Sequence, residues 1–134
     1  MAPIKKIEGI GDKYGDQLKM IGIGTTQALL ERGASTKGRE DVAEKSGISE
    51  KLILEWVNRA DLFRIKGVGE EYSDLLEASG VDTVVELAQR KAENLYEKMV
   101  AVNQQKKLVR KLPTQAQVSS WIEQSKKLPR IVTY

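Results

Sequence analysis

The chain has 134 residues, with 22 lysines and arginines against 19 aspartates and glutamates, and it contains neither cysteine nor histidine. Its 40% apolar and 31% charged residues are typical of a folded globular protein. Without cysteine or histidine the chain has no disulfide, no thiolate nucleophile and no imidazole base or zinc ligand, which excludes catalytic triads and zinc hydrolase chemistry.

The N-terminal residues 1–6 lack the apolar run of a signal peptide. No stretch of about eighteen uncharged apolar residues follows, so no membrane-spanning helix is expected. The absence of cysteine fits a reducing compartment. We therefore expect a cytoplasmic protein that does not insert into a membrane.

Two glycines flank one apolar residue at residues 7–11, Ile-Glu-Gly-Ile-Gly, and again at residues 65–69, Ile-Lys-Gly-Val-Gly. We call these segments the first and second glycine hairpins. The residues that follow each of them, 12–21 and 70–79, carry apolar side chains at helical spacing. Gly22 and Gly80 are expected to end these two helices, because glycine readily adopts the left-handed conformation that follows a helix.

Further helix starts are marked by hydroxyl residues. Thr25 and Ser49 are expected to be N-caps, and Thr83 and Thr114 begin sequences with the spacing of a capping box. Trp56 and Trp121 lie on the apolar stripes of helices that close each half. Because no segment alternates apolar and polar residues, we predict an all-α fold of about eight short helices.

The sequence also repeats itself after a shift of 58 residues, from Ile7/Ile65 through Gly22/Gly80 to Arg32/Arg90. Farther on the register changes by seven, and Trp56 corresponds to Trp121. We predict two pseudo-symmetric units, residues 1–64 and 65–134, packed together as one globular domain.

The first hairpin has the features of an anion site. Its glycines permit a tight turn, so that Ile10 can point into the core while the unpaired amides near Gly11 to Lys13 point outward. Such donors at the positive end of a helix dipole favour phosphate.

Trp56 and Trp121 are expected to pack in the core and not to stack on bases, because they occupy equivalent positions in the two repeats and aromatic residues are few.

These residues resemble the helix-hairpin-helix motif, in the pattern apolar-x-Gly-apolar-Gly-x-x-x-small-x-x-Leu followed by Gly-apolar. Two copies resemble the double helix-hairpin-helix DNA-binding domain. Over residues 7–134 the chain is similar to a tandem helix-hairpin-helix family of unknown function (domain of unknown function 4332), notably at Leu54-Glu-Trp and at the terminal Leu128-Pro-Arg. The resemblance implies that backbone amides hold DNA phosphates, helped by a basic residue at the position of Lys13. It also allows a monovalent cation at a hairpin carbonyl.

Charge distinguishes the two hairpins and is also unevenly distributed within the second half of the chain. Glu70 and Glu71 directly follow the second hairpin, and Glu71 stands where the first copy has Lys13, so Gly67, Val68 and Gly69 are expected to be structural. Residues 65–88 hold one lysine against six carboxylates, a net charge of −5, whereas residues 89–134 hold ten cations against three carboxylates, a net charge of +7. A basic cluster of this kind can contact a phosphate backbone.

We predict a non-catalytic, sequence-independent DNA-binding module with no cofactor, no metal and no small-molecule substrate. The alternative is a protein–protein interaction or scaffold module of the same fold, which binds a protein partner or a second copy of itself. The candidate nucleic-acid-binding residues are Gly9, Ile10, Gly11, Lys13, Lys106, Lys107, Arg110 and Lys111, and the structural residues of the second hairpin are Gly67, Val68 and Gly69.

Overall fold

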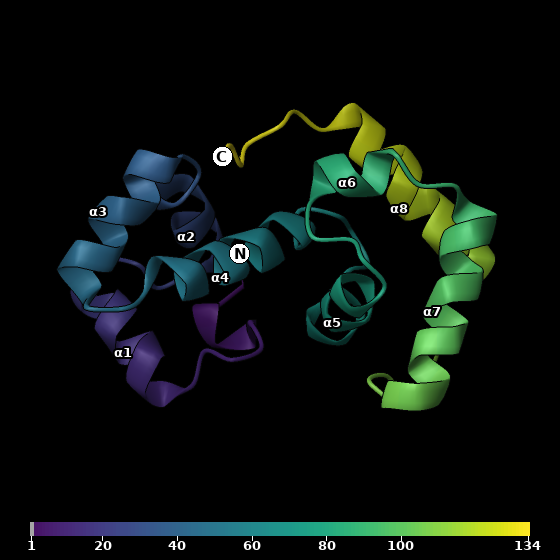
Figure 1. Ribbon diagram of the computed structural model, residues 1–134, viewed down its shortest axis with the longest axis horizontal. Coiled ribbons are helices and arrows are strands. Elements are labelled where there is room, and N and C mark those ends of the chain that lie inside the picture. The colour runs from purple at the N-terminus through teal and green to yellow at the C-terminus, as the bar shows by residue number, and fades with distance from the viewer. Residues whose placement is uncertain (1) are drawn as a thin grey trace. The chain divides into compact units, whose positions relative to one another are not determined.

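The computed structural model describes residues 2–134, and the expected all-α fold is confirmed (Figure 1). Within those residues no β-sheet forms, although Pro3 and Thr25 make an isolated antiparallel bridge. The helices follow one another as η1 (Ile4–Lys6, a 3-10 turn), α1 (Asp12–Met20), α2 (Thr26–Arg32), α3 (Thr36–Ser46), α4 (Glu50–Leu62), α5 (Glu70–Ala78), α6 (Val84–Ala88), α7 (Ala92–Lys106) and α8 (Gln115–Lys127).

The chain divides into two compact units. Unit 1 comprises Met1–Asp61 together with Arg130–Tyr134, and unit 2 comprises Leu62–Pro129. Unit 1 therefore contains η1, α1, α2, α3 and nearly all of α4, whereas unit 2 contains α5 to α8. The last five residues, which we call the C-terminal segment, belong to unit 1.

Glycine ends α1 and α5 in the same way, as the sequence predicts. Gly22 and Gly80 have φ angles of 87° and 93°, in the left-handed region. At the end of α1, the amide of Gly22 donates to the carbonyl of Lys19 at 3.0 Å and the amide of Ile23 donates to that of Leu18 at 2.9 Å. This is a Schellman motif, and it satisfies carbonyls that a helix end otherwise leaves free. The corresponding bonds of α5 run from Gly80 to Glu77 and from Val81 to Leu76, both at 2.9 Å.

Side chains cap the helices that follow. Thr25 accepts the amide of Ala28 at 3.1 Å, and Ser49 accepts that of Leu52 at 3.3 Å. Thr114 forms a complete capping box with Gln117, as predicted. At Thr83 the hydroxyl caps α6, but the Glu86 carboxylate pairs with Arg90 at 3.2 Å. Ser35, which the sequence reading did not single out, caps α3 through the amide of Gly38 at 3.0 Å.

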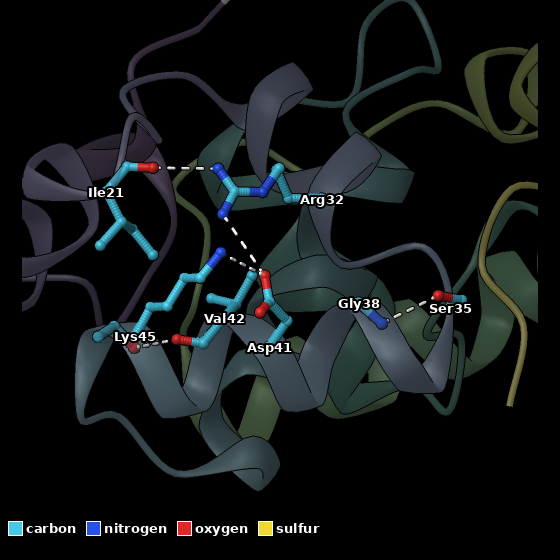
Figure 2. A network of polar contacts seen from close by, with 8 residues as sticks. Ile21, Arg32, Ser35, Gly38, Asp41, Val42 and Lys45 are labelled. Atoms are coloured by element: carbon cyan, nitrogen blue, oxygen red, sulfur yellow. Dashed lines mark hydrogen bonds and ion pairs between the residues drawn. The ribbon is translucent and has the colours of Figure 1, made fainter.

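In unit 1, α3 packs against both α1 and α2. Gly38 permits close approach, because a Cβ atom there would collide with the carbonyl oxygen of Arg32 at the end of α2. Arg32 donates from Nη1 to the carbonyl of Ile21 at 3.0 Å, and its Nη2 lies 3.9 Å from Asp41, which also pairs with Lys45 at 3.2 Å (Figure 2). A cation at the carbonyl end of α1 is favourable, because that end of the helix dipole is negative.

A buried arginine holds the C-terminal segment in unit 1. Arg39 is 5% exposed and donates to the carbonyl oxygens of Gly33 at 2.9 Å, Ala34 at 3.1 Å and Thr133 at 2.7 Å. The amide of Thr133 donates in return to the carbonyl of Ala34 at 2.8 Å. The guanidinium also lies over the ring of Tyr134, 5.7 Å from its centroid. Together these contacts bind residues 130–134 to the turn between α2 and α3.

In unit 2, α8 lies beside α6 and α7, and α5 packs against α7 (Figure 1). One apolar core joins these four helices. Its fully buried members include Leu62, Ile65, Leu75, Leu76, Leu87, Leu95, Met99, Val118 and Trp121.

Candidate functional site

The first glycine hairpin is a tight turn. The amide of Ile10 donates to the carbonyl of Ile7 at 3.1 Å, and Gly9 has a φ angle of 92°. A Cβ atom on Gly9 would lie 3.4 Å from Nε1 of Trp56, so both the conformation and the close indole favour glycine. Ile10 is 4% exposed. Because its side chain is buried, Ile10 can contact a ligand only through its backbone, like Gly9 and Gly11.

Gly11 opens α1 without a side-chain cap. The first helical bond runs from the amide of Gly15 to the carbonyl of Gly11 at 2.9 Å, so the amides of residues 12–14 have no partner within the helix. Nothing lies within 4 Å of the position that a Cβ atom would take on Gly11. Three unpaired donors thus stand at an open surface at the positive end of the α1 dipole.

Lys5 adds a positive charge at the start of α1. Its Nζ donates to Oδ1 of Asp12 at 3.0 Å and lies 3.9 Å from Asp16. The hydrogen bond and the charge of Lys5 hold the pKa of Asp12 below its ordinary value of 3.8, and the pKa of Lys5 is raised by the same hydrogen bond and charge. The Lys5 stem crosses Gly15, where a Cβ atom would come 2.9 Å from Cε. Lys5 thus offsets the Asp12 charge, and Lys13 stands exposed beside them.

The second glycine hairpin has the same backbone but different charges. The amide of Val68 donates to the carbonyl of Ile65 at 3.1 Å, and Gly67 has a φ angle of 95°. A Cβ atom on Gly67 would lie 3.0 Å from Nε1 of Trp121. Gly69 opens α5 without a side-chain cap, but the first turn carries Glu70 and Glu71. Carboxylates favour a helix N-terminus and repel an incoming phosphate.

Gln124 fixes the second hairpin from α8. Its Oε1 accepts the amide of Lys66 at 2.9 Å, and its Nε2 donates to the carbonyl of Lys66 at 3.2 Å. One side chain thereby satisfies both backbone groups of a hairpin residue. Nothing in the local pattern around Gln124 signals this role.

Both tryptophans are core residues, as expected. Trp56 and Trp121 are 3% and 2% exposed, which leaves no face on which a base could stack. Each contacts the tyrosine of the neighbouring helix, with ring centroids 5.1 Å apart for Tyr14 and Trp56 and 5.3 Å apart for Tyr72 and Trp121. Such tilted pairs are a favourable arrangement of aromatic rings.

The predicted binding residues fall into two groups. Gly9, Ile10, Gly11 and Lys13 lie together in unit 1, at the start of α1. Lys106 ends α7, and Lys107, Arg110 and Lys111 lie in the segment that leads to α8, all in unit 2. All four basic side chains are exposed.

The described residues show neither a metal centre nor a transmembrane element. Across residues 2–134 no group of three or more carboxylates is placed to hold a metal ion. No helix in this part of the chain has the length and apolar character to cross a bilayer.

These observations define an all-helical protein of two units, in which each unit has a glycine hairpin against a buried tryptophan and an uncapped helix after the hairpin. The chain belongs to the family described as a domain of unknown function (DUF4332), whose family model matches residues 8–128. No curated protein and no solved structure matched the chain significantly.

Proposed function

We propose that both units are helix-hairpin-helix modules and that the chain is a non-catalytic, sequence-independent nucleic-acid-binding protein, with the first hairpin holding a backbone phosphate of DNA. The order of hairpin, helix, glycine turn and capped helix supports the motif in residues 7–32 and 65–88. Binding of this kind positions the phosphate backbone and does not read bases.

The observation that carries the proposal is the uncapped start of α1. In α2, α3, α6 and α8 a threonine or serine side chain accepts an amide of the first turn. At α1 the N-cap is Gly11, which has no side chain to do so, and nothing lies within 4 Å of the position that its Cβ atom would take. An external anion can take the place of the missing cap, which is how helix N-termini bind phosphate.

The charges around the two hairpins favour phosphate binding at the first hairpin and oppose it at the second. Asp12 begins α1, but Lys5 offsets it at 3.0 Å and Lys13 adds a free cation. At the start of α5, Glu70 and Glu71 occupy the positions of Asp12 and Lys13.

The test replaces the missing cap with one from the protein. Gly11 has φ −85° and ψ −169°, an extended conformation that suits an aspartate N-cap. Gly11→Asp should therefore leave the fold intact while its carboxylate occupies the amides and repels phosphate. We expect wild-type protein to raise the anisotropy of a short labelled duplex at low salt, and Gly11→Asp to abolish that rise.

Gly69→Asp is the matched control, because it makes the same change at the same place in the second hairpin, where the N-cap is also extended. Binding should be unchanged in this variant. Equal loss of binding in Gly11→Asp and Gly69→Asp would contradict phosphate binding by the first hairpin. So would an unchanged anisotropy when wild-type protein is added to labelled duplex and to labelled single strands.

The alternative function is protein–protein interaction. The observation that favours it is the pair Glu70 and Glu71 in the first turn of α5, since two carboxylates beside the second hairpin are suited to a basic protein surface. Sedimentation analysis separates the two functions. Self-association or a stable protein partner, with no response to nucleic acid and no effect of Gly11→Asp, would favour the scaffold function.

A further inference from the structure

The segment between α7 and α8 concentrates positive charge. From residue 98 to residue 122 the chain contains five lysines and arginines and no carboxylate, and four of the cations lie in residues 106–111. We call residues 106–111 the basic loop. Its four cations are exposed, and none of them forms an ion pair within residues 2–134. The charge of the loop is therefore available to a partner.

The backbone of the basic loop is fixed in place. The Asn103 side chain donates to the carbonyl of Val109 at 3.2 Å and accepts its amide at 3.0 Å. Tyr72 donates to the carbonyl of Lys111 at 3.1 Å, and Val109 is buried. These bonds fix the backbone at Val109 and Lys111, and so the positions from which the side chains of Arg110 and Lys111 extend.

Lys107 occupies a conformation that costs free energy. Its φ and ψ of 50° and 48° are left-handed, and no other non-glycine residue among those described has a positive φ. At the end of α3 the same role belongs to Gly47, with φ 75°. A lysine is strained there, because its Cβ atom crowds the backbone, whereas glycine is not. Strained residues cluster at binding and active sites, so a lysine kept where glycine would fit better supports a functional role for its side chain.

We propose that the basic loop is a second phosphodiester-binding surface, and that the chain contacts nucleic acid at two places, the first hairpin on unit 1 and the basic loop on unit 2. The proposal rests on the proposed function for its ligand class. It assigns a share of the salt-dependent affinity to Lys106, Lys107, Arg110 and Lys111, in addition to that of Lys13, and it leaves the second hairpin without a ligand.

An anionic membrane is the other polyanion that such a loop could meet, but the apolar surface is too small. Leu108, 36% exposed, is the loop's one exposed apolar side chain. The α7 helix that leads into the loop packs against α5 and α8. Stable attachment to a bilayer needs a broad apolar face in addition to basic residues, whereas a phosphate backbone needs only the cations.

The decisive variant is Lys107→Gly, because it separates stability from binding. Removing the left-handed strain should raise the thermal midpoint by about 3 °C. Losing one phosphate contact should reduce the salt slope of duplex binding by about 0.9. Lys127→Gln, which removes one exposed cation of the same unit at the end of α8, is the control and should change neither quantity much. A gain in stability with unchanged binding would overturn the proposal.

A triple variant, Lys106→Gln with Arg110→Gln and Lys111→Gln, tests the surface as a whole, with Lys91→Gln, Lys126→Gln and Lys127→Gln as a control that removes the same charge. The loop variant should lower the salt slope by about 2.7, and the control should not. If the loop variant binds duplex normally and Gly11→Asp does not, the basic loop is not a binding surface, but the first hairpin still is. If Gly11→Asp binds normally and the loop variant shows the lower salt slope, the basic loop binds nucleic acid and the first hairpin does not. Absence of wild-type binding would overturn both, as would binding to phosphatidylserine vesicles in place of duplex.

Discussion

The side chain of Gln124 on α8 exchanges two hydrogen bonds with the backbone of Lys66, in the second glycine hairpin. Gln124→Ala should therefore free the Lys66 amide and lower the free energy of unfolding by about 1 kcal/mol, because two exposed hydrogen bonds are lost. Hydrogen exchange at the Lys66 amide and urea unfolding measure the two effects. Gln105→Ala, on the exposed end of α7, is the control. Unchanged protection at Lys66 would show that Gln124 does not hold the hairpin.

The second prediction concerns the Lys5–Asp12 pair. Because the Asp12 pKa lies below 3.8 in the folded protein, the pair contributes stability above the unfolded pKa, and that contribution is lost as the pH falls through the folded pKa. Because the Lys5 pKa lies above 10.5, its contribution is complete below that pH and is lost as the pH rises through the folded value. Lys5→Met should raise the Asp12 pKa toward 3.8.

Carbon-13 chemical shifts of the Asp12 carboxyl group, followed against pH, measure this change. Lys19→Met is the matched control, since Lys19 acts on Asp12 only by a weak charge effect and should move its pKa less. An Asp12 pKa that is the same with and without Lys5 would mean that the ion pair does not persist in solution.

The third prediction concerns Arg39. Arg39→Met removes donors from the carbonyls of Gly33, Ala34 and Thr133 and should lower the free energy of unfolding by about 2–3 kcal/mol, since these are charge-assisted hydrogen bonds in a buried site. Chemical denaturation measures the loss. Deleting residues 130–134 removes the Thr133 acceptor, so Arg39→Met should cost less in the shortened chain. Strictly additive losses would indicate that Arg39 and the C-terminal segment are not coupled.

The fourth prediction reverses a normal helix preference. Replacing a helical glycine with alanine ordinarily stabilises a helix by about 1 kcal/mol. Gly38→Ala should instead destabilise the protein by about 1–3 kcal/mol, because the added methyl group meets the Arg32 carbonyl oxygen. Gly24→Ala, outside the helices and with nothing within 4 Å of the new atom, is the control for adding a methyl group without a clash. Thermal unfolding compares the two, and a stabilised Gly38→Ala protein would contradict the packing of α2 on α3.

Local signals were enough to predict α1, α5 and the starts of α2, α4, α6 and α8. The Schellman turns at Gly22 and Gly80 and the hydroxyl caps at Thr25 and Thr114 depend on residues within a few positions of one another. The buried tryptophans followed from apolar spacing.

Contacts between distant residues were not predictable in the same way. No local pattern marks Arg39 as buried, and its bond to Thr133 spans 94 positions. Gln124 reaches Lys66 across 58 positions. Lys5 lies in a 3-10 turn before the first hairpin, so the hairpin pattern does not predict that its charge lies at the start of α1. For Arg39 and Gln124 the partner is set by how helices and segments pack within one unit and not by sequence neighbours.

The grouping of residues 130–134 with unit 1 has a consequence for biosynthesis. Unit 2 is continuous in sequence, whereas unit 1 is built from both ends of the chain. Translation proceeds from the N-terminus, and domains generally form as soon as their residues are available. The helices of unit 1 are therefore made before unit 2, and the C-terminal segment after it. The Arg39–Thr133 hydrogen bond, which joins these two parts of unit 1, can form only after all of unit 2 has been synthesised.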